Sequence, residues 1–175
     1  PISAVISDGH YKMDIPFKSE HPLLPNNYGV AESRLESLFK IFSKNDNMYE
    51  RYQAGIRDLV NKGFAERVPK EEISVTDRPV WYIPHHAVIN PQKPDKLRIV
   101  FDCSAQFQGT SLNSEVHQGP DLTNKLLGVL LRFRQFQVAF MGDIEAMFHQ
   151  VKVSEKHRDA LRFLWWPDQD RSKPP

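Results

Sequence analysis

The chain has 175 residues and a mass of 20.3 kDa, with 40% hydrophobic and 26% charged residues, which is the composition of a folded domain and excludes a disordered one. Its 23 basic and 22 acidic residues give a formal net charge of +1, so any surface for a polyanion must be local. The single cysteine, Cys103, excludes an internal disulfide, and no run approaches the roughly 20 apolar residues that cross a bilayer.

The first predicted element is a strand near the start of the chain. Apolar and polar residues alternate over residues 8–17, which is typical of a half-buried strand, and Pro16 places that strand at the edge of a sheet. Residues 18–29 are polar and contain two prolines, so we expect a connector there.

Two amphipathic helices are predicted next. Apolar residues at helical spacing predict the first helix near residues 31–43. The second helix begins after Asn45 or Asp46, either of which can cap it, and ends at Gly63. The residues expected to be buried are Leu35, Leu38, Phe39 and Phe42 in the first helix, and Tyr49, Tyr52, Ile56, Leu59 and Val60 in the second.

Hairpins are predicted in the middle of the chain. Residues 69–78 are charged and hairpin-like. An apolar run over residues 80–89, a Pro-Gln-Lys-Pro-Asp turn and a second apolar run over residues 97–101 predict a larger β-hairpin. His85 and His86 are neighbours on its first strand, so they point to opposite faces and cannot share one metal ion.

A third helix and two further strands complete the pattern. Asp121 is expected to cap the helix, and Gln137–Met141 is expected to be a central strand that ends at Asp143. Leu161–Trp166 is expected to be another strand that buries its tryptophans. The apolar face of the third helix comprises Leu122, Leu126, Val129, Leu130 and Phe133. These elements together predict an α+β fold.

Five segments resemble a known family. They are Pro79-Val-Trp-Tyr-Ile-Pro-His-His-Ala-Val-Ile-Asn-Pro, Lys96-Leu-Arg-Ile-Val-Phe-Asp102, the pair Ser111-Leu-Asn and Gly119-Pro-Asp-Leu, and Gly142-Asp-Ile-Glu-Ala-Met-Phe-His-Gln-Val. Together they resemble the reverse transcriptase of BEL/Pao-type long-terminal-repeat retrotransposons, most strongly from Tyr49 to Trp166. The resemblance implies a connector over residues 1–45, the fingers over 46–136 and the beginning of the palm over 137–175.

The resemblance assigns a metal-binding role to Asp143. In this family the first palm motif is a strand ending in an aspartate that binds both catalytic Mg²⁺ ions, for which Mn²⁺ can substitute, and the backbone carbonyl of Ile144 would be a further ligand. Mg²⁺ prefers oxygen ligands and keeps several waters, so one or two carboxylates with substrate phosphates suffice. Two such ions stabilise the attacking 3′-hydroxyl and the leaving pyrophosphate.

The resemblance also assigns residues to nucleotide binding. Arg98 stands where the family has an arginine that clamps the triphosphate, a task that suits a planar guanidinium. A second basic residue assists, and spacing leaves both Lys93 and Lys96 open for that role. Phe148 matches the aromatic side chain that lies under the sugar and rejects a 2′-hydroxyl by collision.

The implied function is DNA synthesis from deoxynucleoside triphosphates on a primed RNA or DNA template. The implied partners are the remaining palm and thumb and the protease, ribonuclease H and integrase parts of a polyprotein, with no membrane. The expected location is a cytoplasmic virus-like particle with a nuclear phase. No Asp-Asp dipeptide occurs in the chain. The family's Tyr-x-Asp-Asp hairpin is therefore lacking, and we expect the isolated chain to be an inactive fragment holding one of three catalytic carboxylates.

Two other hypotheses remain open. The chain could be a non-catalytic nucleic-acid-binding remnant of a decayed retroelement. Alternatively, Asp143, Glu145 and His149 could form a hydrolytic metal site, because the last two are four residues apart on an expected helical turn.

Overall fold

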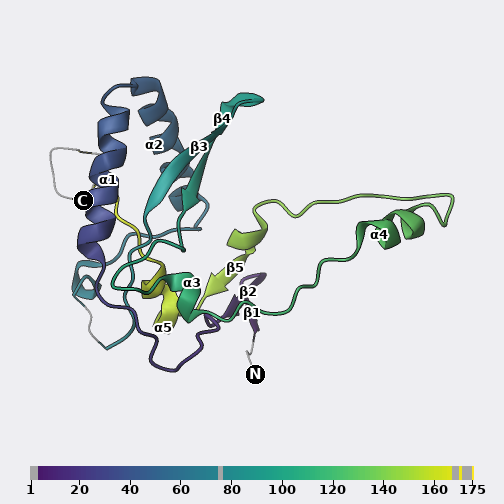
Figure 1. The fold of residues 1–175 in the computed structure, drawn as a ribbon, viewed down its shortest axis with the longest axis horizontal. Helices are drawn as coiled ribbons and strands as arrows, with labels where there is room; N and C mark the ends of the chain where they lie inside the picture. Colours follow the sequence, from purple (N-terminus) through teal and green to yellow (C-terminus); the bar gives the residue numbers. More distant parts are fainter. Residues whose placement is uncertain (1–3, 75–76, 167–169, 171–174) are drawn as a thin grey trace.

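Two helices follow the predicted connector. The computed structural model describes residues 4–74, 77–166, 170 and 175, and it places α1 at Tyr28–Phe42 and α2 at Asp46–Asn61 (Figure 1). The side-chain oxygen of Asn45 accepts a hydrogen bond of 3.0 Å from the backbone N–H of Met48, so Asn45 is the cap of α2. Both predicted helices are confirmed.

The buried faces of these helices agree with the prediction in part, since Phe39, Tyr49 and Leu59 are only half-buried. Val60 was expected to be buried, but its side chain is 49% exposed, so that expectation is wrong. It lies in the last turn of α2, next to Leu59, which packs against the core. The buried residues are Ala31, Leu35, Leu38 and Phe42 in α1 and Tyr52 and Ile56 in α2.

The large β-hairpin is confirmed, with shifted boundaries. Strand β3 (His85–Asn90) begins after the start of the predicted apolar run and pairs antiparallel with β4 (Lys93–Phe101). The register runs from His85 opposite Phe101 to Ile89 opposite Leu97, and then shifts so that Asn90 pairs with Lys93. Much of the expected turn therefore belongs to β4. One face of the hairpin packs on α2.

The first predicted strand is only partly correct. Strand β2 (His10–Met13) is shorter than expected, and it lies in the middle of a three-stranded sheet instead of at an edge. It pairs antiparallel with β1 (Val5–Ser7) and parallel with β5 (Val151–Val153). Pro16 does not prevent this pairing because it lies beyond the end of the strand.

Two further segments differ from the prediction. The charged stretch 69–78 contains a 3-10 turn, Lys70–Glu72, in place of a hairpin, while residues 75–76 lie outside the described residues. After α5 (Glu155–Arg158) and the 3-10 turn Asp159–Leu161, the chain is extended but not a strand. It forms a single bridge, Arg162 with Tyr82, because it lies beside the irregular chain that leads into β3.

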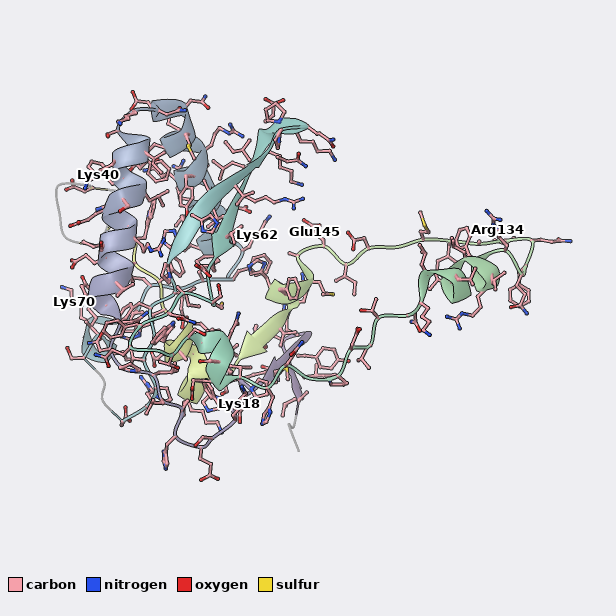
Figure 2. All side chains as sticks on the ribbon, viewed as in Figure 1. Lys18, Lys40, Lys62, Lys70, Arg134 and Glu145 are labelled. Atoms are coloured by element: carbon pink, nitrogen blue, oxygen red, sulfur yellow. The ribbon has the colours of Figure 1, made fainter. Side chains whose placement is uncertain are left out.

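Residues 117–145 leave the body of the fold as an extended arm that carries α4 (Leu126–Phe133) (Figures 1 and 2). We call this segment the arm. Every residue in it except Gly128 is exposed, so the expected apolar face of the third helix is not buried. Asp121 does not cap α4; its carboxylate accepts a hydrogen bond from the backbone N–H of Thr123 instead.

The predicted central strand Gln137–Met141 is also wrong. These residues form no strand, and the side chain of Phe140 is 92% exposed. A strand depends on hydrogen bonds to neighbouring strands. Among the described residues no strand pairs with this segment, so its apolar sequence alone does not make it one. No helix in the described ranges is both long and apolar enough to cross a membrane.

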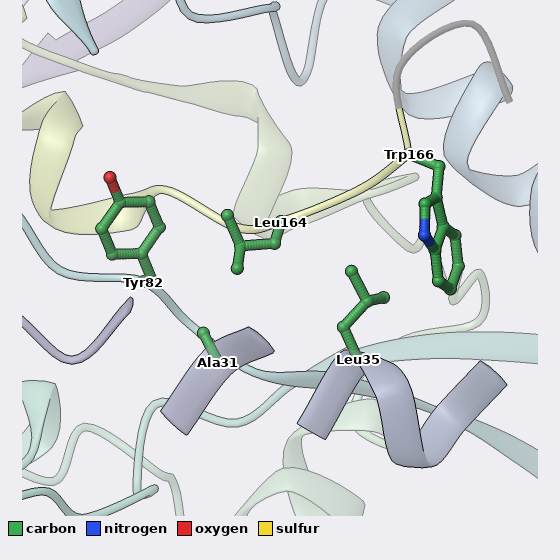
Figure 3. Packing of buried hydrophobic residues seen from close by; sticks show 5 residues of the cluster. All are labelled: Ala31, Leu35, Tyr82, Leu164 and Trp166. Carbon is green, nitrogen blue, oxygen red and sulfur yellow. The ribbon is translucent and has the colours of Figure 1, made fainter. Parts of the chain in front are cut away.

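Three hydrophobic clusters form the core of the body. The first joins α1 to the chain before β3 and to the C-terminal segment, as Figure 3 shows. The second lies between α1, α2 and the hairpin. The third surrounds the fully buried Trp81 and includes Leu112 from α3 (Leu112–Glu115). The residues of the first cluster are Ala31, Leu35, Tyr82, Leu164 and Trp166. The architecture is thus α+β.

Candidate nucleotide-binding site

Arg98 lies on the solvent-facing side of the β3–β4 hairpin. Its neighbours on β4, Leu97 and Ile99, are half-buried against α2, while Arg98 itself is exposed and pairs with Val88 on β3. Side chains alternate between the two faces of a strand. Because one face of the hairpin packs on α2, the opposite face, which carries the guanidinium group of Arg98, points toward solvent.

The two candidate lysines lie on the same strand as Arg98. Lys93 pairs with Asn90 at the tip, and Lys96 lies where the register shifts; both are exposed. A guanidinium nitrogen of Arg51 on α2 donates a hydrogen bond of 2.8 Å to the carbonyl oxygen of Pro94, which ties the tip to the helix. The hairpin places the three predicted basic residues on one strand, and it leaves the choice between the lysines open.

Asp102 follows β4 directly and is held in a turn. Its carboxylate accepts hydrogen bonds from the hydroxyl and the backbone N–H of Ser104, at 2.5 and 3.1 Å. These bonds, first of all the one from the hydroxyl, hold the pKa of Asp102 below its usual value. The carboxylate of Asp102 is therefore used to close the turn after the hairpin.

The predicted metal ligand Asp143 lies on the returning limb of the arm. Its carboxylate is exposed and accepts a hydrogen bond of 3.0 Å from the backbone N–H of Ile144. The expected strand before it and the expected helical turn after it are absent: Ala146 has a left-handed φ of +50°, and a 3-10 turn follows at Met147–Gln150. Phe148 in that turn is 85% exposed.

The described residues alone would not form the predicted two-metal site. Each Mg²⁺ takes about six oxygen ligands. Asp143 and the carbonyl of Ile144 offer two candidate oxygens, and no group of three or more metal-binding side chains occurs in the described parts of the chain. No hydrogen bond or ion pair among the described residues joins Asp143 to Arg98, Lys93 or Lys96. A complete site would need further carboxylates.

The hydrolytic metal hypothesis has no support from this geometry. Asp143, Glu145 and His149 do not gather into a metal-binding group in the portion of the chain that is described. The ring of His149 instead stacks on Phe64, with a centroid distance of 4.8 Å and an interplanar angle of 14°. The structure therefore does not bring these three residues together as that hypothesis requires.

A buried histidine joins the hairpin to α2 and to the C-terminal segment. His85 donates from Nε2 to the carbonyl of Leu164 at 2.9 Å, because a carbonyl can only accept. Its Nδ1 therefore accepts from the hydroxyl of Tyr52, at 2.5 Å. His86 is exposed, so the predicted opposite orientation of the two histidines is confirmed. Burial lowers the pKa of His85 and raises that of Tyr52.

A network of ion pairs joins residues 72–78 to residues 159–162. Buried Asp159 pairs with Arg162 at 2.6 Å and with Arg78 at 2.5 Å. Arg162 also donates to the carbonyl of Ile73 at 3.0 Å, and Arg78 pairs with Glu72 at 2.8 Å. The charged character of residues 69–78 was visible in the sequence, but the partners of these residues, about 90 residues away, were not.

No model of a known protein family matches this chain, and no curated protein or solved structure matches it.

Proposed function

We propose that this chain is the fingers and the beginning of the palm of a polymerase similar to BEL/Pao-type reverse transcriptases, and that it does not polymerise alone. One observation carries the proposal. The β3–β4 hairpin packs on α2 through one face and presents Arg98 to solvent from the other, with Lys93 and Lys96 on the same strand.

This arrangement suits a triphosphate. A guanidinium group binds phosphate oxygens with two parallel hydrogen bonds, and a lysine adds a mobile positive charge. Packing on α2 holds the backbone of the hairpin in place, so binding of an anion costs side-chain entropy but little backbone entropy. Phosphate recognition by the hairpin requires no rearrangement of the core.

The exposed arm supports the same proposal. It presents large apolar side chains around Asp143, including Phe140 and Met141, which are 92% and 88% exposed. Extensive apolar surface of this kind marks a site that other protein covers. We propose that the remaining palm covers it and supplies the carboxylates that complete the metal site beside Asp143.

Primer extension tests the proposal. The experiment compares the 175-residue chain, a form continued through the remaining palm and thumb, and that longer form with Asp143→Asn, on a primed RNA template with Mg²⁺. We expect only the unsubstituted long form to add deoxynucleotides. If the long form binds template without extending the primer, the chain is a nucleic-acid-binding remnant instead.

Triphosphate binding to the hairpin is tested on the chain itself. Ultraviolet cross-linking of a radiolabelled deoxynucleoside triphosphate with Mg²⁺ should label β4, and Arg98→Ala should reduce the labelling. Arg57→Ala is the matched control, because Arg57 is exposed on α2 and lies outside the hairpin. Equal labelling of the two variants would contradict a clamp at Arg98.

A further inference from the structure

The two predicted nucleotide contacts, Arg98 and Phe148, lie in different parts of the fold. Arg98 is on the hairpin that packs on α2, and Phe148 is in the 3-10 turn where the arm returns to the body. A stack of two rings connects these parts: Phe64 follows α2, and His149 follows Phe148 directly. The near-parallel rings, 14° apart, give a contact with a defined orientation.

Phe64 is fixed by the way α2 ends. Its backbone N–H donates to the carbonyl of Leu59 at 2.9 Å, and the N–H of Gly63 donates to the carbonyl of Val60 at 3.0 Å. Gly63 has a φ of +70°. This is the pair of bonds of a Schellman motif, which locks the residue after the glycine relative to the helix. The ring of Phe64 therefore has a defined place at the end of α2.

His149 is fixed from the other side. Its backbone N–H donates to the carbonyl of Ala146 at 2.8 Å, and the turn runs straight into β5, which pairs with β2. The carbonyl of Gln150 accepts a hydrogen bond of 3.3 Å from Nδ1 of His10 on β2. The small sheet thus holds the turn that carries His149, so the ring contact joins two elements that are each anchored.

Opposite charges lie beside the stack. Lys62 at the end of α2 forms an ion pair of 2.8 Å with Asp58. The pKa of Lys62 is raised, mainly by Asp58 and to a smaller degree by the carboxylate of Glu145. Figure 2 shows Lys62 and Glu145 next to each other where the arm returns. The attraction between Lys62 and Glu145 favours contact between the returning limb of the arm and the end of α2, as the ring stack does.

We propose that the Phe64–His149 stack is a positioning contact, which sets Phe148 relative to the β3–β4 hairpin and thereby controls the rejection of ribonucleotides. The inference rests on the proposed polymerase function. A side chain that excludes a 2′-hydroxyl by collision works only at a fixed distance from the bound triphosphate. The hairpin packs on α2, α2 leads into Phe64, and the ring of Phe64 contacts His149 beside Phe148, so a chain of contacts connects the two predicted nucleotide-binding residues.

The contact itself is tested in the 175-residue chain, without any polymerase activity. The Cε1 proton of His149 should show a ring-current shift in the proton NMR spectrum. Phe64→Leu should remove the shift, and Phe64→Tyr should keep it because tyrosine preserves the ring. A His149 signal that is the same in the wild type and in Phe64→Leu would overturn the inference.

The role is tested in the form continued through palm and thumb. Phe64→Leu and His149→Ala should each lower the ratio of kcat/KM for a deoxynucleotide to that for the matching ribonucleotide, on the order of tenfold. His149→Phe should restore the ratio, since it keeps a stacked ring. The thermal midpoint should not change among these variants.

The outcomes separate the two proposals. An unchanged ratio in active Phe64→Leu enzyme overturns the positioning role and leaves the polymerase function standing. An equal fall in kcat for both nucleotides with a lower thermal midpoint also overturns it, because that is the effect of a purely structural contact. If the wild-type long form adds no nucleotide at all while the NMR shift is present, the polymerase function fails and the positioning role fails with it.

Discussion

The fully buried amide of Asn27 fixes the start of α1 to the chain that leads into the hairpin. Its nitrogen donates to the carbonyl of Tyr82 at 2.7 Å, and its oxygen accepts from the N–H of the same residue at 2.8 Å. The side chain thus imitates one rung of a β-ladder. An isosteric carboxylate cannot do this, because one of its oxygens would face the carbonyl of Tyr82.

Asn27→Asp should therefore lower the free energy of unfolding by about 3 kcal/mol, since it removes a buried donor and buries a charge without a partner. Urea denaturation measures the change. Asn26→Asp is the matched control, because the exposed oxygen of Asn26 accepts from the N–H of Tyr28 and a carboxylate keeps that role. Equal effects of the two substitutions would contradict the account.

His85 should make the stability depend on pH. Its pKa is lowered in the folded state by burial among Tyr52, Phe101, Phe163 and Trp165. An unfolded histidine titrates near pH ~6.5. The unfolded state therefore binds more protons below that pH, so the stabilisation is complete above about pH 6.5 and decreases on acidification, by at most about 1.4 kcal/mol per pH unit.

The prediction is checked by measuring the free energy of unfolding between pH 7.5 and pH 5. His85→Gln keeps a donor for Leu164 and an acceptor for Tyr52 but does not titrate, so its profile should be flatter. His157, whose pKa is also lowered, contributes to both profiles and cancels in the comparison. If the profile of His85→Gln is as steep as that of the wild type, the assignment to His85 is wrong.

At the scale of elements, the sequence predicted best where a structure depends on local pattern. The apolar spacing of α1, the cap Asn45 and the two apolar runs of the hairpin are all local, and all three elements are found. The strand at Gln137–Met141 failed because a strand requires a partner, and the described residues supply none. The pairing of Tyr11 with Val151 was invisible because nothing local marks it.

In the candidate site, too, the features set by local sequence pattern could be predicted, and those that depend on distant partners could not. The exposure of Arg98 follows from strand alternation and could be predicted, as could the opposite orientations of His85 and His86. The stack of His149 on Phe64 could not, because each ring belongs to a turn whose geometry depends on a left-handed residue, Gly63 or Ala146. An aromatic residue in a turn gives no signal about which distant ring it meets.

The contact between α2 and β4 is close at Gly55. A Cβ atom on Gly55 would lie 2.8 Å from Cδ1 of Ile99. Glycine within a helix costs about 1 kcal/mol relative to alanine. The close approach of helix and strand offsets this cost, so the gain in helix propensity from Gly55→Ala is opposed by a clash with Ile99.

A double-mutant cycle should separate the gain in helix propensity from the clash with Ile99. Ile99→Val removes Cδ1, so Gly55→Ala should be more favourable in the Ile99→Val background, with a coupling free energy on the order of 1 kcal/mol. Gly29→Ala is the control, because a Cβ there meets nothing within 4 Å, and its effect should add to that of Ile99→Val. Additivity at Gly55 would mean that Ile99 moves aside without cost.

At the scale of the whole molecule, the C-terminal segment over residues 159–166 holds the body together. Leu164 and Trp166 belong to the first cluster, Phe163 and Trp165 contact the second, and Ala160 belongs to the third. The same segment carries the buried Asp159–Arg162 pair described above. One short stretch of chain thus contributes to every hydrophobic cluster.

A chain that ends at Arg158 should not fold cooperatively. Burial of Leu164 and Trp166 alone contributes about 3–6 kcal/mol, whereas a whole domain is stable by only about 5–15 kcal/mol. Thermal unfolding followed by far-ultraviolet circular dichroism should show no sharp transition. A chain that ends at Trp166 is the control and should keep one; a cooperative transition in both would show that the clusters form without this segment.

The arm has a consequence for chain connectivity. Its first end is held by a hydrogen bond of 2.9 Å from the N–H of His117 to the carbonyl of Pro16, and its second end runs into β5, which pairs with β2. The arm is therefore a long loop whose two ends are both held by the body. Each halving of a flexible loop lowers the entropy cost of closing it by only about 0.6 kcal/mol.

Replacing residues 119–144 with a glycine-serine linker of about half that length should therefore leave the free energy of unfolding of the body unchanged within about 1 kcal/mol. Urea denaturation and the dispersion of the NMR spectrum would check this, and loss of the folded body would contradict it. If the body tolerates the exchange, sequence changes in the arm are constrained by what covers it, and insertions or deletions there are neutral for the stability of the rest.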